Sequence, residues 1–419
     1  MMKTTEKLYD TKPYETEFTA RIISMTGSAD HEGCYEVILD RTLFFPEEGG
    51  QTPDGGCLKL RLSDGTALQM DVEDVQIDGT GIIIHYAKVM DPNGDFEEKL
   101  AEALDEETEV AGRIDWPHRF SNMQQHTGEH IFSGIVHEKY GYDNVGFHLS
   151  DNIVTMDYNG MLKPDEVTEI ETLANEAIAS NIRIKCYYPD NETLKSLPYR
   201  SKKELTGAVR IVEITGVDIC ACCAPHVAYT AEVGMLKVIG TQKYKGGIRL
   251  SILCGMRALD YVRRIQKIAK ETAAELNSPM EPEDVRAGLK AVEDQLIRQK
   301  MTISALNKRL LDAELEKVKE NGDDHVVIFT EDIDNLTVRN ALNILVTEHP
   351  GYCAVFNRSG EAYNYIIASA NLDSRLMADA MREVLNSRGG GKAEMVQGQV
   401  TASEDEVKAF ANQFLKSVL

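Results

Sequence analysis

Residues Gln124–His130 read Q-Q-H-T-G-E-H and lie within Arg119–Tyr140, a segment predicted to be a helix. His126 and His130 are four positions apart, so on a helix both imidazole rings project from one face. Two histidines at this spacing are a common pair of ligands for zinc. Glu129 does not directly follow the first histidine, which argues against a zinc peptidase of the H-E-x-x-H type. The segment therefore predicts half of a metal site.

A second segment repeats this spacing with two further zinc ligands. Residues Cys220–His226 read C-A-C-C-A-P-H, and Cys222 precedes His226 by four positions. Thiolate and imidazole groups bind zinc strongly, and a thiol without metal is reactive. The two pairs are roughly 90 residues apart, so separate elements of one domain can bring them together around one tetrahedral Zn²⁺. Cys220 or Cys223 could replace Cys222 in this ligand set.

The composition is that of an ordinary globular protein. The chain has 419 residues, of which 42% are hydrophobic and 27% charged, and this length predicts about two to four domains. Its apolar runs are far shorter than the ~20 residues that span a bilayer, and its first residues do not form a secretory signal. We therefore predict a cytoplasmic protein without a membrane partner, whose eight cysteines do not form a disulfide scaffold.

Predicted strands and helices divide the chain into four parts with an α+β multidomain fold. Gly-rich breaks separate short strands in the first part, whereas strands and helices are mixed in the second and fourth. The predicted domains are a β-barrel-like N-terminal domain at 1–112, an α+β zinc-binding domain at 113–255, a helical coiled-coil linker at 256–320 and an α/β domain at 321–419.

The third part contains a repeating apolar seam. Its members step by four and three residues, with Gln299 in one expected apolar position: Val285, Leu289, Val292, Leu296, Ile303, Leu306 and Leu310. This spacing predicts a coiled coil or a helical hairpin, within one chain or between chains. The alternative is an amphipathic helix that lies on its own domain.

The net charge limits how the chain could hold nucleic acid. Lys and Arg number 45 and Asp and Glu number 68, which gives −23, whereas binding to phosphates relies on cations. RNA would therefore have to be held by local basic patches. The side chains predicted to make such contacts lie on either side of the second metal segment: Arg210, Lys243, Lys245 and Arg249.

These motifs and two others resemble a known family. Residues Leu39–Gln51 read L-D-R-T-L-F-F-P-E-E-G-G-Q, and Gly389–Gly398 reads G-G-G-K-A-E-M-V-Q-G. Together with the two zinc segments, they are similar to motifs of free-standing alanyl-tRNA editing proteins of the long AlaX type. That family is related to the editing domain and the C-terminal, DHH-associated domain of alanyl-tRNA synthetase. The family's usual C-G-G-T-H is C-C-A-P-H here.

The resemblance implies a reaction and a partner. The reaction is zinc-dependent, ATP-independent hydrolysis of serine or glycine from mischarged tRNA for alanine. The second domain is then the editing domain. A rival interpretation is a catalytically silent zinc-containing RNA-binding or regulatory protein. A homodimer through the coiled coil or the C-terminal domain is also expected.

The resemblance also implies roles for individual residues. Thr42 would read the serine hydroxyl and Gln51 would line the same cleft. His148, eighteen positions after His130, is a candidate acid or base, or a contact to the ribose. The glycines whose backbone would approach phosphate, or serve dimerisation instead, are Gly389, Gly390 and Gly391.

Overall fold

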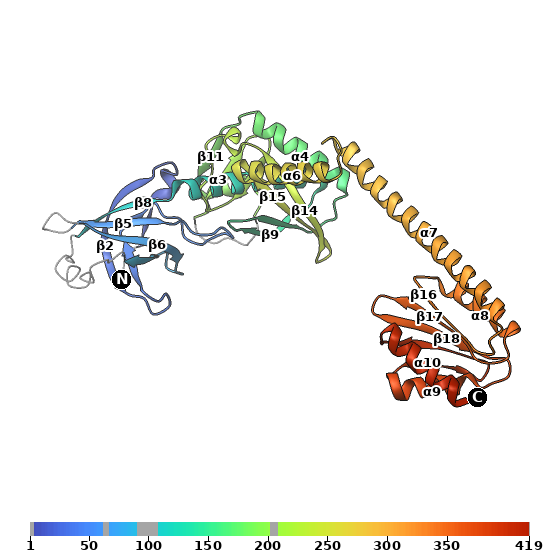
Figure 1. The fold of residues 1–419 in the computed structure, drawn as a ribbon. Coiled ribbons are helices and arrows are strands. Elements are labelled where there is room, and N and C mark those ends of the chain that lie inside the picture. The colour runs from blue at the N-terminus through green and yellow to red at the C-terminus, as the bar shows by residue number, and fades with distance from the viewer. Residues whose placement is uncertain (1–3, 62–66, 90–107, 202–207, 419) are drawn as a thin grey trace. The chain divides into compact units, whose positions relative to one another are not determined.

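The computed structural model describes residues 4–61, 67–89, 108–201 and 208–418. The chain forms two compact units, Met1–Ile268 and Ala269–Leu419 (Figure 1). Both units mix strands with helices, so the predicted α+β multidomain fold is confirmed. The division between the units falls within helix α6 (Gly255–Glu275), and the predicted domain boundaries stay predictions. None of the helices in the described ranges is both long and apolar enough to cross a membrane.

The predicted N-terminal barrel is confirmed as six strands that close on themselves. Burial alternates along β2 because successive side chains of a strand point to opposite faces. The order around the barrel is β2 (Glu17–Gly27), β3 (Cys34–Leu39), β7 (Ile83–Val89), β6 (Ala67–Ile77), β5 (Gly56–Arg61) and β8 (Glu109–Ile114). Three short elements belong to the same part of the chain: β1 (Glu6–Lys7), α1 (Leu8–Thr11) and β4 (Arg41–Thr42).

The remainder of the first unit packs two antiparallel sheets against helix α3 (Trp116–Tyr140). The larger sheet has the order β14 (Leu236–Tyr244), β15 (Gly247–Cys254), β10 (Val154–Tyr158) and β9 (Asn144–Leu149). The smaller has the order β11 (Ile184–Tyr187), β12 (Ile211–Ile214) and β13 (Asp218–Ala221). The other helices are α4 (Pro164–Ala179), α5 (Asn191–Ser196) and the 3₁₀ helix η1 (Thr230–Val233).

Helix α3 has a clear start and stop in its sequence. The Asp115 side chain accepts a hydrogen bond from the His118 N–H, and Pro117 lies in the first turn, both of which favour a helix N-terminus. Gly141 ends the helix in the left-handed conformation with φ 66°, which glycine adopts without steric cost. The helix thus starts slightly before the predicted segment and ends where it was predicted to end.

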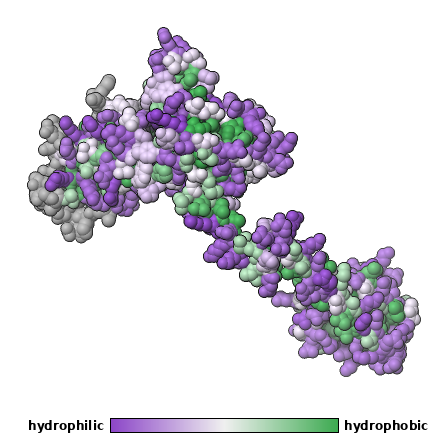
Figure 2. Space-filling view, turned by 90° about the horizontal axis from the view of Figure 1, so that it is seen from above, coloured by the Kyte–Doolittle hydropathy of each residue, from purple (hydrophilic) through white to green (hydrophobic). Residues whose placement is uncertain are grey.

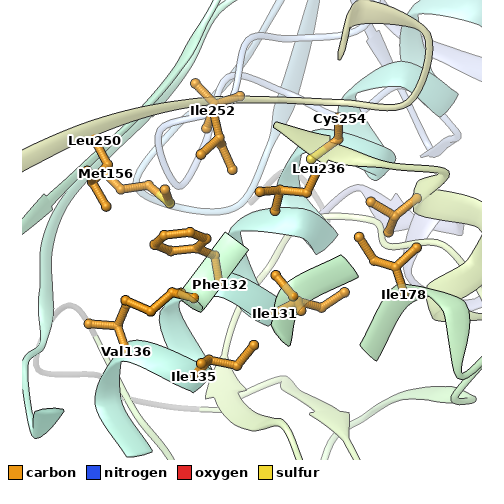
Figure 3. Packing of buried hydrophobic residues seen from close by; sticks show 14 of the residues in the cluster. Ile131, Phe132, Ile135, Val136, Met156, Ile178, Leu236, Leu250, Ile252 and Cys254 are labelled. Carbon is orange, nitrogen blue, oxygen red and sulfur yellow. The ribbon is translucent and has the colours of Figure 1, made fainter. Parts of the chain in front are cut away.

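Helix α3 is fixed on two sides. Ile131 and Phe132 lie in a core that includes Leu250 of β15 (Figure 3). Near the start of the helix, the fully buried Arg119 forms an ion pair with the fully buried Asp54 of the barrel part. Breaking such a pair typically costs about 3–5 kcal/mol because one charge is left buried and uncompensated. The part of α3 that carries His126 and His130 is therefore held between the barrel and the sheet.

The second unit is a sheet covered by helices. The sheet has the order β16 (Val326–Glu331), β17 (Cys353–Ser359), β18 (Ala362–Ala368), β20 (Met395–Val400) and β19 (Arg388–Lys392). Strands β16 and β17 run parallel, and the other neighbours are antiparallel. The helices are α7 (Pro282–Asn321), α8 (Asn335–Glu348), α9 (Ser374–Leu385) and α10 (Glu404–Val418).

Helix α7 contains the predicted apolar seam. Its C-terminal part packs on the sheet of this unit, where Leu311 and Leu315 join the core between β16 and α8. Most of the seam is exposed by half or more, and apolar residues appear along this helix in Figure 2: Leu289 50%, Leu296 52%, Ile303 51%, Leu306 50% and Leu310 66%. The coiled coil itself stays a prediction.

Candidate metal centre

The two segments singled out in the sequence converge in the first unit. His126 and His130 come from α3, whereas Cys222 and His226 come from the loop after β13. Their ligand atoms all lie within 4.8 Å of one another, and only Cys222 is more than slightly exposed. These four side chains could hold one metal ion.

The distances within the group fit a tetrahedral ion. The Cys222 Sγ lies 3.5 Å from His126 Nε2 and 3.4 Å from His226 Nε2. Bond lengths of about 2.3 Å for zinc–sulfur and about 2.1 Å for zinc–nitrogen place two tetrahedral ligands about 3.6 Å apart. The donor set of three imidazoles and one thiol is also one that zinc accepts.

Each histidine is oriented through its other ring nitrogen. The Nδ1 of His130 donates to Asp218 Oδ2 at 2.9 Å, and that of His126 donates to Gln51 Oε1 at 2.8 Å. The Nδ1 of His226 lies 3.0 Å from the Thr127 hydroxyl. Such partners fix the ring so that Nε2 is left for the metal, and their loss typically costs about 10–100-fold in metal affinity.

Charges and burial around the group favour the ligand forms of Cys222 and His226, but not that of His130. Burial favours the neutral thiol of Cys222, but the neighbouring rings of His126 and His226 outweigh it and hold the pKa of Cys222 well below its ordinary value. Burial lowers the pKa of His226 to about 3, which keeps that imidazole neutral. Burial also disfavours charge on His130, yet Cys220 and Asp218 raise the pKa of His130 well above its ordinary value. Thiolate and neutral imidazole are the forms that bind a cation, so His130 would release its proton when a metal ion binds.

Two residues of this supporting shell were not predicted from the sequence. Asp218, which holds His130, is itself held by Arg200 through two hydrogen bonds of 2.8 Å. Thr127, which holds His226, also accepts from the backbone N–H of Val227 at 3.4 Å. A signal was present, because Asp218 lies four residues before Cys222 and Thr127 lies between the two histidines of α3.

The other two cysteines of the second segment have different surroundings. Cys220 groups with His130 and Asp218, with ligand atoms within 4.8 Å of one another. Cys223 faces the barrel side, where its Sγ would lie 3.2 Å from a Cβ added at Gly49. The geometry thus favours Cys222 over its neighbours as the ligand beside His126 and His226.

The segment Leu39–Gln51, which contains Gly49 and Gly50, reaches the four candidate ligands through its last residue, Gln51. This residue bridges to Leu149 of β9 and is 1% exposed. Gly50 has φ 84°, and a side chain there would clash with Phe147 O at 2.5 Å, so only glycine fits. The Gln51 Oε1 holds His126, while its Nε2 is buried and has no hydrogen-bond partner within the described parts of the chain.

Thr42 lies in the barrel core, where both functions of its hydroxyl are used. It donates to His85 Nε2 at 2.8 Å and accepts from the Phe44 N–H at 3.0 Å, and it is fully buried. Burial lowers the pKa of His85 to about 4, which keeps its ring neutral and able to accept this bond. The predicted reading of a serine hydroxyl by Thr42 stays a prediction.

The predicted acid or base His148 lies on β9, opposite Thr155 of β10. Its side chain is exposed and it is not part of the group of four ligands. On the neighbouring strand β10, Asp157 pairs with Arg249. The role of His148 stays a prediction.

The basic side chains that were predicted to contact RNA near Cys220–His226 differ in their surroundings. Arg210 is 5% exposed, and its guanidinium donates to the carbonyls of Cys222 and Ala224 at 3.1 and 2.8 Å. Arg210 thus holds the loop that carries Cys222 and His226. Its contact to RNA stays a prediction. Lys243 and Lys245, by contrast, lie at the end of the β14–β15 hairpin.

Arg249 lies on the same hairpin. It is bound to Asp157 at 2.5 and 2.6 Å and stacks on the Tyr244 ring at 3.9 Å. In the second unit, Gly389, Gly390 and Gly391 form most of the exposed strand β19 at the edge of its sheet. Backbone at such an edge is accessible to a partner.

Comparisons with known proteins identify relatives of this chain. Residues 209–251 match the family model "Threonyl and Alanyl tRNA synthetase second additional domain". The chain is 26% identical to the alanyl-tRNA editing protein AlaX-L of Pyrococcus horikoshii over 99% of each chain. It is 25% identical to the alanyl-tRNA editing protein Aarsd1-A of Xenopus laevis over 97% of each chain. The chain is therefore similar to alanyl-tRNA editing proteins over nearly its whole length.

Larger and smaller proteins also match. An alanine–tRNA ligase of Ignicoccus hospitalis is 29% identical over 96% of this chain, but the chain spans only 42% of that ligase. The crystal structure of the C-Ala domain from Aquifex aeolicus alanyl-tRNA synthetase matches 20% of this chain with 21% identity and a TM-score of 0.19.

Proposed function

From the similarity to alanyl-tRNA editing proteins along the whole chain, we propose that this protein is a zinc-dependent aminoacyl-tRNA deacylase. It hydrolyses the ester that joins a wrong amino acid, serine or glycine, to tRNA for alanine, and it acts on that tRNA in trans. The observation that carries the proposal is the convergence of His126, His130, Cys222 and His226 in a chain related throughout to editing proteins.

The need for such a reaction follows from binding energetics. A pocket shaped for alanine rejects a substrate that differs by one methylene by only about 10–200-fold, and one with an added hydroxyl by about 10²-fold. A second site that forms a hydrogen bond with the serine hydroxyl discriminates better, because alanine would leave its polar group unpaired. Glycine and serine are thus the errors that a separate deacylase would remove.

The four ligands would hold Zn²⁺, and the donor set and its spacing support that metal. When bound, zinc supplies a Lewis acid that polarises an ester carbonyl or lowers the pKa of water towards about 7. The chain's own residues orient the site: Asp218, Gln51 and Thr127 fix the three rings. Gln51 would also offer its buried amide N–H to the substrate, because an unsatisfied buried donor otherwise costs about 1–3 kcal/mol.

The β14–β15 hairpin would contact the acceptor end of the tRNA. Lys243 and Lys245 provide cations there, and Tyr244, with Arg249 stacked on one face, resembles the aromatic platforms that bind unpaired bases. The edge strand β19 would contact the tRNA elsewhere. A second copy of the chain is a further proposed partner, along the exposed seam of α7 or through the C-terminal domain.

The test combines metal analysis with deacylation. We expect the purified chain to contain zinc and to release serine or glycine, but not alanine, from charged tRNA for alanine. His126→Ala and Cys222→Ala should lose both zinc and turnover, whereas Cys186→Ala, at an exposed cysteine, should lose neither. A zinc-loaded protein that binds tRNA but releases no amino acid would favour the catalytically silent RNA-binding protein instead.

A further inference from the structure

We propose that Glu129 is a catalytic residue that holds and orients the water that attacks the ester. This inference rests on the proposed deacylase function and extends it. Four protein ligands complete a tetrahedron, which is typical of structural rather than catalytic zinc. Hydrolysis at such a site therefore calls for another group that positions water beside the ligands.

The Glu129 carboxylate is rigidly held next to the ligand group. It is fully buried, and its Oε1 accepts hydrogen bonds from the Asn144 amide at 2.6 Å and the Ser133 hydroxyl at 2.7 Å. The Ser133 hydroxyl is in turn 2.7 Å from the Tyr158 hydroxyl. The other oxygen, Oε2, lies 3.9 Å from His130 Nε2, the nitrogen of His130 that is left for the metal.

A cleft lies beside the side chains that orient Glu129 and His130. It has a volume of about 790 Å³, and its lining includes Asn144, which holds Glu129, and Asp218, which holds His130. Arg200 and Gly134 also line it. The two side chains that orient the Glu129 carboxylate and the His130 ring thus both contribute to the wall of this cleft.

The step at this site balances as a simple hydrolysis. Glu129 Oε2 accepts a hydrogen bond from one O–H of the water, which turns the water oxygen toward the ester carbon. The new C–O bond forms from that oxygen, and the bond from the carbonyl carbon to the ribose oxygen breaks. The proton that the water loses ends on the ribose oxygen, so the products are a free amino acid and an uncharged tRNA.

A purely structural role for Glu129 predicts a different result for the variant Glu129→Gln than the holding of water does. In Glu129→Gln, the side-chain carbonyl can still accept the hydrogen bonds of Asn144 and Ser133, so a structural network would survive. The NH₂ group that replaces Oε2 donates hydrogen bonds and cannot accept one from water. The substitution therefore separates packing from the holding of water.

The experiment compares the wild-type protein with Glu129→Gln and with Glu176→Gln, a matched change at an exposed position of α4. The readouts are zinc content, the visible spectrum of the cobalt-substituted protein, and kcat and KM for release of serine. We expect Glu129→Gln to keep its zinc and cobalt spectrum and its KM, and to lose about 10²-fold or more in kcat, as positioned acid–base groups contribute. Glu176→Gln should match the wild type.

Three results would overturn the inference. A kcat within about threefold of the wild type (~0.7 kcal/mol) would show that Glu129 does not act on the water. Loss of zinc, or an altered cobalt spectrum, would show that Glu129 acts on the metal group itself. No release by the wild-type protein would contradict the proposed function and with it this role, and the wild-type assay identifies that case separately.

Discussion

At the scale of single residues, the site depends on which polar atoms already have hydrogen-bond partners within the protein. The Thr42 hydroxyl both donates and accepts within the barrel, whereas Gln51 Nε2 is buried beside His126 without a hydrogen-bond partner in the described residues. A group whose bonds are already formed gains little from a substrate. These contacts favour Gln51 over Thr42 as the group that reads the amino acid.

This difference can be measured. Because Gln51 also orients His126, the comparison is made at saturating zinc, where we expect Gln51→Ala to reduce release of serine more than release of glycine, since only serine offers a hydroxyl to the lost amide. Thr42→Val should instead lower the free energy of unfolding by about 1–3 kcal/mol, because it leaves the buried His85 nitrogen unpaired. Gln69→Ala, on β6, is the control. If Thr42→Val selectively reduced serine release at unchanged stability, Thr42 would be the reader.

At the scale of elements, the site requires α3 to lie very close to the chain before β13. Gly134 makes this approach possible, because a Cβ there would come within 2.3 Å of Val217 O. The neighbouring Asp218 holds His130 of the same helix at 2.9 Å. The same contact, between α3 and residues 217–218, therefore packs the helix and orients the His130 ring.

We expect Gly134→Ala to lower stability and metal affinity together. Overpacking of a core typically costs about 1–3 kcal/mol, and displacement of Asp218 from His130 should weaken zinc binding by about 10–100-fold. Denaturant unfolding and a zinc titration with a competing chelator measure the two effects. Gly27→Ala, where an added Cβ meets nothing within 4 Å, should change neither. Normal zinc affinity in a destabilised Gly134→Ala protein would separate packing from ligand orientation.

At the scale of the whole molecule, the exposed seam of α7 has the spacing of a helix that packs on another helix. Leu289, Leu296 and Leu306 are each exposed by about half, although burying a leucine side chain typically gains about 1.5–3 kcal/mol. Among the described residues of this helix, Leu311 and Leu315 are the buried ones, and they join the core between β16 and α8. A second copy of the chain would cover the rest of the seam.

We expect the chain to be a dimer in solution at micromolar concentration. Leu296→Gln combined with Leu306→Gln should convert it to a monomer, measured by light scattering after size-exclusion chromatography. Lys300→Gln, off the seam on the same helix, should leave the dimer intact. A wild-type monomer would contradict the dimer, and a double variant that remains dimeric would assign the interface to another surface, such as the C-terminal domain.

The sequence alone was sufficient for the local features of this protein. The i, i+4 spacing of His126 and His130 and of Cys222 and His226 is set by helix and loop geometry over a few residues, and the strands of the barrel follow from alternation and glycine breaks. Only the tertiary structure decided what surrounds the ligands. Asp218 and Gln51 meet histidines that are 88 and 75 residues away in the chain, and Glu129 is held both by Ser133 of its own helix and by Asn144 of β9. Residue types and spacing are local properties, whereas burial and hydrogen-bond partners depend on which surfaces meet.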